Sequence, residues 1–318
     1  MVYERPKAPE ANPVNLRPTP CSLLSPPFTD TARNRGASGS PSATSSRLWY
    51  TPRVSERPDA DGRALRSVDI LGVRVDDVTE VEALAWAANA IQRGGPHLVV
   101  TPNAEFVMRA RRERPFRDVL GRADLSIPDG AGLLLAGRIL GTPLREQVTG
   151  TDLLVGIAGL CATEGWRIYL LGGDDGVAEA AGRSLQARLP GLEVAGAFAG
   201  SPRVEDEAGI IARIRSAAPV HVLAVAYGAP SQEQWLARNL PKLDVALGIG
   251  IGGALDFISG RVPRAPRWLR RAGLDWLYRL ARQPWRWRRQ LALPRFVLTA
   301  LWVRARGGRS NPAGSGTE

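Results

Sequence analysis

The sequence lacks several features that define common protein classes. It has only two cysteines, Cys21 and Cys161, which lie far apart without metal-ligand spacing and so argue against a disulfide framework or a CxxC metal site. No run reaches the roughly 18 apolar residues that a membrane-spanning helix needs. The N-terminus also lacks a charged-then-apolar secretory pattern. We therefore expect a protein on the cytoplasmic side, with no metal that the sequence clearly demands.

Positive charge is concentrated near one end of the chain. The net charge is +11, and residues 261–309 hold fourteen arginines, no lysine and a single acid, Asp275. This segment alone carries +13, so the rest of the chain is slightly acidic. A basic block of this kind favours polyanionic partners, namely nucleic acid, anionic lipid or a phosphorylated substrate.

Composition divides the chain into four parts. Ten of the 25 prolines lie in residues 1–58, among serines, arginines and glycines, which predicts a disordered tail over residues 1–66. Residues 67–260 are expected to form the main domain. Residues 261–306 are a basic appendage rich in tryptophan, and residues 307–318 a second tail.

Strand-like and helical patterns alternate through the main domain. VDILGVRVDDV alternates like a strand, and the following TEVEALAWAANAI has helical spacing, with Thr79 and Glu82 forming a capping box. This alternation predicts an α/β fold with a Rossmann-like, mostly parallel sheet and helices on both faces. Ligands of such folds bind beyond the carboxyl ends of the strands. Those ends are predicted at residues 101–103, 128–130, 172–175, 228–233 and 250–256.

The stretch GIGIGG places glycines at Gly248, Gly250 and Gly253, which fit a dinucleotide fingerprint. A dinucleotide site also needs a following βαβ unit and an acid about 20 residues further on. Here Asp275 falls in a helical pattern after the sheet has ended. We interpret the loop either as backbone N–H groups open to phosphate or sugar, or as tight packing of backbone on a neighbouring element. A nucleotide-dependent oxidoreductase is an alternative that cofactor binding would test.

Polar residues in three of the loops suggest chemistry. Asp129 stands on a turn at a strand end, where it could be a turn former or a general base for a hydroxyl group. Asp174 and Asp175 lack the D-x-D spacing of a metal-binding pair and are expected to cap a helix. Ser231 is expected to cap the next helix, which places Gln232 and Glu233 on the first turn, close to a ligand above the sheet.

The basic appendage has the composition of an interfacial helix. Five of the nine tryptophans lie in it, interleaved with its arginines. Residues 274–281 have amphipathic helical spacing, and FVLTALWV is too short to span a bilayer. Tryptophan beside arginine is typical of helices that lie at the membrane surface. A helix packed on the core, with merely solvated arginines, is the other interpretation.

Seven stretches together resemble the WecG/TagA/CpsF family of bacterial glycosyltransferases. In order over about residues 67–290, they are VDILGVRVDDVT, VTPNAEFV, ADLSIPDGAG, VTGTDLL, YGAPSQEQW, GIGGALDFISGRVPRAP and GLDWLYRLARQPWRWRR. The resemblance implies a Rossmann-like domain with a C-terminal, membrane-associating helical appendage. It implies an inverting transferase that works at the inner face of the cytoplasmic membrane.

The activity implied by the resemblance is the transfer of an N-acetylaminosugar, similar to N-acetylmannosamine, from a UDP-sugar to a polyprenyl-pyrophosphate-linked sugar. Such a reaction builds cell-surface polysaccharide or the linkage unit of teichoic acid. No cofactor is implied beyond the UDP-sugar, which is the donor substrate.

By position, the resemblance implies that Asp129 is the catalytic base that deprotonates the acceptor hydroxyl. The family commonly has an arginine, thought to steady the diphosphate, where this chain has Gln147. Arg145 or an arginine of the tail would then replace it. The predicted substrate-binding residues are Thr101, Asn103, Gly130, Arg145, Gln147, Gln232, Glu233, Gly252, Gly253, Asp256, Arg264 and Arg279.

A nucleic-acid-binding protein is the main competing hypothesis. The arginines and tryptophans of residues 261–309 would suit phosphates and base stacking. That hypothesis leaves the polar loops of the sheet domain without a role, so we expect an anionic membrane surface rather than nucleic acid as the partner. Association into a homo-oligomer stays open.

Overall fold

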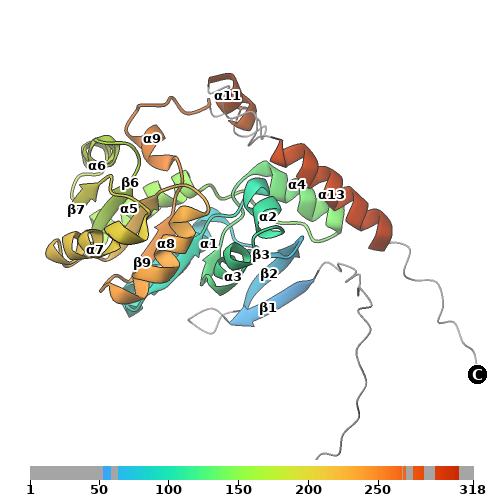
Figure 1. The fold of residues 1–318 in the computed structure, drawn as a ribbon, viewed down its shortest axis with the longest axis horizontal. Coiled ribbons are helices and arrows are strands. Elements are labelled where there is room, and N and C mark those ends of the chain that lie inside the picture. The colour runs from blue at the N-terminus through green and yellow to red at the C-terminus, as the bar shows by residue number, and fades with distance from the viewer. Residues whose placement is uncertain (1–52, 59–63, 267, 270–274, 283–290, 308–318) are drawn as a thin grey trace, which may run out of the picture. The chain divides into compact units, whose positions relative to one another are not determined.

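The computed structural model of the protein describes residues 53–58, 64–266, 268–269, 275–282 and 291–307. Its centre is a six-stranded parallel sheet in the order β5-β4-β9-β8-β6-β7 (Figure 1). In that order the strands are Leu125–Ser126, His97–Val100, Leu247–Gly250, Val222–Ala226, Arg167–Gly172 and Glu193–Phe198. The predicted α/β fold with a parallel sheet is therefore confirmed.

Helices cover both faces of this sheet, and the alternation of side chains along each strand explains why. In β4, Leu98 and Val100 point into one apolar cluster while Val99 points into the other. One face packs against α1 (Glu80–Arg93), α5 (Gly150–Glu164), α6 (Val177–Arg188) and α9 (Ala254–Ile258). The other packs against α2 (Ala104–Ala110), α3 (Arg114–Arg122), α7 (Glu207–Ser216) and α8 (Ser231–Asn239).

A second, antiparallel sheet of three strands precedes α1. It consists of β1 (Val54–Pro58), β2 (Ala64–Ile70) and β3 (Val73–Asp76). The sequence placed the start of the folded chain near Ser67, which is too late, because β1 and the first residues of β2 lie in the segment assigned to the tail. β1 reads VSERP, an exposed edge strand with charges and a proline, and such strands carry little hydrophobic signal. The other predicted boundaries stay predictions.

The helix start at Thr79 follows the predicted capping box. The Thr79 side chain accepts a hydrogen bond from the Glu82 backbone, and the Glu82 carboxylate accepts one from the Thr79 backbone. Both bonds satisfy donors that a helix start leaves without intrahelical partners.

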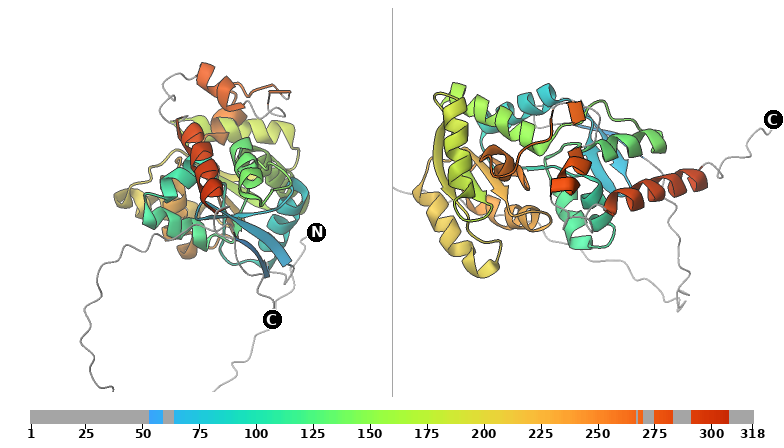
Figure 2. Two further views of the ribbon diagram at one scale, coloured as in Figure 1. Left: turned by 90° about the vertical axis from the view of Figure 1, so that its right-hand side faces the viewer. Right: turned by 90° about the horizontal axis from the view of Figure 1, so that it is seen from above.

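The C-terminal part of the described chain contains α11 (Asp275–Arg282) and α13 (Ala292–Gly307). α13 lies beside α2 and α4 (Ala131–Leu140), as Figure 1 and the views of Figure 2 show. Its inner face is part of the core, since Phe296, Ala300 and Val303 are buried there. Pro294 lies in the first turn of α13, where a missing N–H does no harm.

No helix within the described segments combines the length and the apolar character that crossing a bilayer requires.

Candidate active site

The carboxyl ends of the parallel strands meet at one edge of the sheet and bring several predicted residues together. Thr101 and Asn103 follow β4, and Asp129 and Gly130 follow the neighbouring β5. On the other side of β4 lies β9, which leads into Gly252. We call these loops, together with the start of α5, the strand-end edge.

Asp129 is held between the β4 loop and the start of α5. Its backbone N–H donates to the carbonyl of Pro102, and the N–H of Val148 donates to the carbonyl of Pro128. One carboxylate oxygen, Oδ2, lies 3.4 Å from the backbone nitrogen of Gly150 at the α5 start. The side chain is half-buried. Its position is thus fixed by backbone contacts while part of it stays exposed to a reactant.

Thr101 and Asn103, the polar residues after β4, make different kinds of contact. Thr101 is buried, its hydroxyl donates to the carbonyl of Gly250 over 3.1 Å, and its side chain packs on Gly150. Asn103 is half-buried and caps α2 through its side-chain oxygen, which accepts from the N–H groups of residues 105 and 106. Thr101 therefore joins β4, β9 and α5, whereas Asn103 positions a helix start.

The start of α5 is a polar cluster that the sequence did not assign. Thr149 caps the helix, and its hydroxyl also donates to Asp152 over 2.7 Å. Asp152 in turn accepts from both terminal nitrogens of Arg264, at 2.6 Å each. The spacing Thr149-x-x-Asp152 resembles a capping box and was the available signal. Nothing in the sequence indicated a partner 112 positions away.

The segment around Arg264 is fixed at two points. Arg261 pairs with Asp174 over 2.6 Å, and Arg264 pairs with Asp152, so this segment links the loop after β6 to the start of α5. The expectation that Asp174 caps a helix is wrong: the cap residue of α6 is Gly176 and makes no side-chain cap bond. Both arginines come from the predicted appendage, so its first residues contact the loop after β6 and the start of α5.

The glycine stretch of β9 serves close packing. A side-chain carbon on Gly248 would meet Leu240 at 2.7 Å, and one on Gly250 would meet both Gln232 and Glu233 at 2.8 Å. The N–H of Gly252 donates to Gln232 over 2.9 Å. Of the two interpretations, tight packing therefore applies at positions 248 and 250, and the Gly252 N–H is occupied in this structure. Gly253 ends the loop as the cap residue of α9.

Gln232 and Glu233 point inward, although both were expected near a ligand. Their side chains are 1% and 0% exposed. The expected cap by Ser231 is also absent: Ser231 is the first residue of α8, and Pro230 stands at the cap without a side-chain bond. The helix crosses the sheet so that its second and third residues face β9, which a local pattern cannot reveal.

The four remaining predicted residues lie on other elements or beside the Asp129 loop. Arg145 binds Glu82 at 2.9 and 2.6 Å and also contacts Asp77, so its charge is neutralised beside the start of α1. Asp256 lies in the first turn of α9 and is half-buried. Arg279 lies in α11, and its side chain is outside the described residues. Gln147 is half-buried and directly precedes Val148, next to the Asp129 loop.

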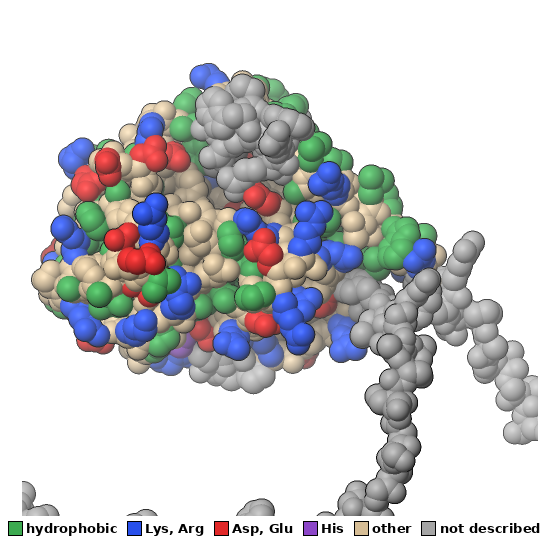
Figure 3. Space-filling model, in the orientation of Figure 1, with side chains coloured by type: hydrophobic (Ala, Val, Ile, Leu, Met, Phe, Trp, Pro, Cys, Tyr) green, Lys and Arg blue, Asp and Glu red, His purple; other side chains and the backbone are tan. Residues whose placement is uncertain are grey.

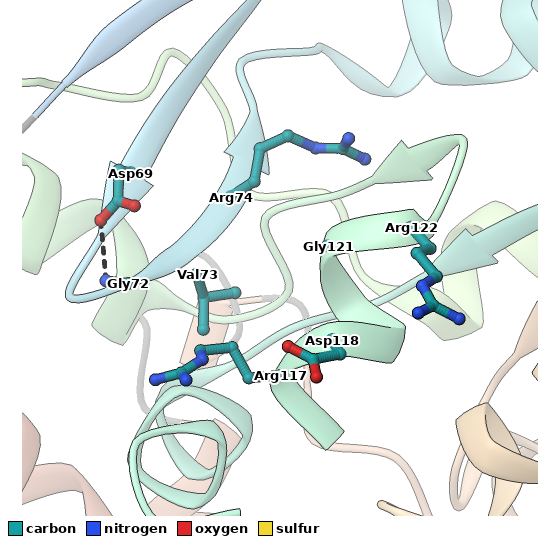
Figure 4. A pocket seen from close by; sticks show the side chains of 8 residues that line it. All are labelled: Asp69, Gly72, Val73, Arg74, Arg117, Asp118, Gly121 and Arg122. Carbon is teal, nitrogen blue, oxygen red and sulfur yellow. Dashed lines mark hydrogen bonds between the residues drawn. The ribbon is translucent and has the colours of Figure 1, made fainter. Parts of the chain in front are cut away.

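Two cavities in the described part of the chain lie away from Asp129. One of about 400 Å³ lies between the β2–β3 turn and α3, with Arg74, Arg117 and Arg122 around it (Figure 4). A larger one, about 890 Å³, lies beside α1 and includes Arg145. Neither is lined by Asp129, Thr101 or Gln232.

The chain is similar to known proteins over most of its length. Residues 68–310 match the family model described as "Glycosyl transferase WecG/TagA/CpsF family". The chain is 33% identical over 204 residues to the N-acetylglucosaminyldiphosphoundecaprenol N-acetyl-beta-D-mannosaminyltransferase of Bacillus subtilis (strain 168), covering 64% of this chain and 78% of that protein. It is 30% identical over 216 residues to the enzyme of the same name from Staphylococcus aureus (strain NCTC 8325 / PS 47), covering 67% and 83%.

The match spans the parallel sheet, the strand-end edge and most of the C-terminal segment. The chain therefore belongs to the WecG/TagA/CpsF family of glycosyltransferases.

Proposed function

We propose that the protein transfers N-acetylmannosamine from UDP-N-acetylmannosamine to N-acetylglucosamine carried on undecaprenyl diphosphate. The relatives are named for transfer of this sugar to this acceptor. The observation that carries the proposal is the strand-end edge, where Asp129 is fixed between the β4 loop and α5 within the matched region. The product would be the linkage unit of teichoic acid or of a related surface polymer.

Asp129 is the proposed general base. An acceptor hydroxyl attacks the anomeric carbon while its proton passes to a carboxylate within hydrogen-bond reach. The bond from this carbon to the UDP oxygen breaks in the same displacement, so the anomeric centre inverts. A half-buried carboxylate whose loop is held by backbone hydrogen bonds suits this task, because its direction stays fixed while a hydroxyl can still approach.

The leaving UDP gains negative charge, and the edge offers cationic and dipolar groups for it. Arg264 reaches the start of α5 next to Gly150, whose N–H faces Asp129. We propose that Arg264, rather than Arg145, provides the positive charge that the family arginine would supply at the position of Gln147. Among the described residues, Arg145 is paired with two carboxylates, whereas Arg264 is paired with one.

The outer face of α13 is the proposed contact with the membrane. Leu298, Leu301 and Trp302 are 65%, 48% and 52% exposed, and the Arg306 guanidinium lies 3.6 Å from the centroid of the Trp302 ring. Figure 3 shows apolar and basic side chains next to each other on the surface over α13. Apolar side chains flanked by arginines suit a helix that lies in the headgroup region of an anionic bilayer. The lipid-linked acceptor would be met there, on the cytoplasmic side.

The experiment is a transfer assay on vesicles. The purified full chain is incubated with vesicles that contain phosphatidylglycerol and a synthetic undecaprenyl-diphosphate-GlcNAc, together with one UDP-sugar at a time. We expect a product heavier by one N-acetylhexosamine with UDP-N-acetylmannosamine, and little or none with UDP-glucose or UDP-N-acetylglucosamine. Absence of product with every donor, or a clear preference for another donor, would overturn the proposal. Mass spectrometry of the lipid fraction reads the outcome.

A further inference from the structure

Gln232 ties two glycine loops of the strand-end edge together. Its side-chain oxygen accepts from the N–H of Gly228, in the loop after β8, at 3.1 Å, and from the N–H of Gly252, in the loop after β9, at 2.9 Å. The side chain is fully enclosed, so no water competes for these bonds. A single carbonyl oxygen therefore sets the distance between two neighbouring loops.

This bridge works only if the amide of Gln232 faces the right way. The two backbone groups are both donors, so the oxygen and not the NH₂ group must face them. Glu233 holds the NH₂ group on the other side of the amide, because its Oε1 accepts a hydrogen bond from Nε2 of Gln232 at 2.6 Å. The carboxylate thereby fixes the amide orientation. Gly250 makes the arrangement possible, since a side chain there would collide with both groups.

Glu233 is an unusual residue for a purely structural task. It is 0% exposed, and its second oxygen, Oε2, has no hydrogen-bond partner among the described residues. Burial raises the pKa of its carboxyl to about 7, which the hydrogen bond from Gln232 and the positive charge of Arg109 only partly oppose. Arg109 itself binds the carbonyl of Ala229 and the carboxylate of Glu113. Within the described residues, Arg109 is the charged group that acts on this carboxyl.

The bridge is connected to Asp129 by a short chain of contacts. Gly250, which packs on Gln232, accepts from the hydroxyl of Thr101 at 3.1 Å. Thr101 packs on Gly150, whose N–H lies 3.4 Å from Asp129 Oδ2. A shift of the β9 loop would therefore be transmitted to the group that faces Asp129.

We propose that Glu233 is a positioning residue for the transfer reaction, which acts through Gln232 by turning its carbonyl oxygen toward Gly228 and Gly252. This inference rests on the proposed function for its effect on rate, but the loop geometry can be tested without it. The ionised carboxylate binds the amide more strongly than a neutral acceptor does, because the hydrogen bond is then charge-assisted.

The test compares Glu233→Gln with the wild type across pH. Below about pH 7 the wild-type carboxyl is protonated and neutral, like the glutamine, so the two rates should be similar. Above pH 7 the wild type is ionised, and its kcat should exceed that of the variant by about tenfold at pH 8.5, if one charge-assisted bond is lost. Glu164→Gln, an exposed carboxylate at the far end of α5, is the matched control and should follow the wild type at every pH.

Hydrogen exchange of the backbone provides a readout that does not depend on transfer activity. The N–H groups of Gly228 and Gly252 should exchange at least severalfold faster in Glu233→Gln than in the wild type at pH 8.5. Glu233→Ala should show a larger effect, provided circular dichroism shows that it folds. If Glu233→Gln keeps both the wild-type pH profile and the wild-type exchange, the inference is wrong. If the wild type shows no transfer at all, the proposed function fails. The exchange rates still test whether Glu233 holds the loops of Gly228 and Gly252 through Gln232.

Discussion

The strand-end edge and α13 place different demands on the sequence. At the strand-end edge, the contacts are polar and directional, and backbone groups of Pro102, Gly150 and Gly250 take part in them. On α13, Phe296, Ala300 and Val303 pack into the core. The outer face presents exposed apolar and basic side chains, and the contact described among them is the stack of Arg306 on Trp302. The edge depends on geometry, whereas the outer face of α13 depends mainly on composition. Substitutions should therefore have steep, specific effects in the first region and graded effects in the second.

With Asp129 left in place, the largest effect is expected on the inner face of α13. Phe296→Ala removes a fully buried ring between α13 and its neighbours, and should lower the free energy of unfolding by about 3–5 kcal/mol. Denaturant unfolding followed by circular dichroism measures this. Leu298→Ala, on the exposed side of the same helix, is the control and should change it by less than about 0.5 kcal/mol. Equal effects of the two substitutions would mean that α13 is not part of the core.

A smaller but more specific effect is expected at Arg264. Arg264→Ala breaks the two-pronged pair with Asp152 and should lower kcat/KM about tenfold, since a charge-assisted pair contributes on the order of 1–3 kcal/mol. Arg264→Lys should recover only part of the rate, because an ammonium group cannot reproduce both bonds. Steady-state kinetics with varied UDP-sugar separates the two variants. A lysine variant with full activity would show that charge alone suffices and that the paired geometry is irrelevant.

The smallest effect per residue is expected on the outer face of α13. Leu298→Ala with Trp302→Ala should weaken binding to anionic vesicles about tenfold, because partial burial of two such side chains is worth on the order of 1–2 kcal/mol. Val204→Ala is a matched control, since Val204 is as exposed as Leu298, at 65%, but lies on a short 3-10 turn before α7. Co-sedimentation with phosphatidylglycerol vesicles measures the partitioning. If the control weakens binding equally, α13 is not the contact.

Sequence patterns predicted the layers of the fold well because those layers depend on local periodicity. The alternation of Leu98, Val99 and Val100 between two clusters is a local property of a strand. The capping box at Thr79 is equally local. β1 was missed because an exposed edge strand with a proline has no such periodicity.

The candidate site was predicted only in part. Asp129, Thr101 and Asn103 were placed correctly at one edge, because parallel strands share a direction. The inward direction of Gln232 and Glu233 was not predictable, because it depends on how α8 crosses β9. The pairing of Arg264 with Asp152 joins distant parts of the chain and likewise left no local signal. The roles of Arg264, Gln232 and Glu233 in the reaction stay predictions.

The central claim is that Asp129 accepts the proton of the acceptor hydroxyl, and the rate of Asp129→Asn tests it most directly. Asparagine keeps the shape of the side chain but cannot take the proton, so the single-turnover rate with both substrates saturating should fall by about 10²–10⁴-fold. Affinity for UDP should stay within about threefold, since other groups bind the donor. Asp118→Asn, an exposed carboxylate on α3, should leave the rate unchanged. An Asp129→Asn enzyme that retains most of the wild-type rate would contradict the account.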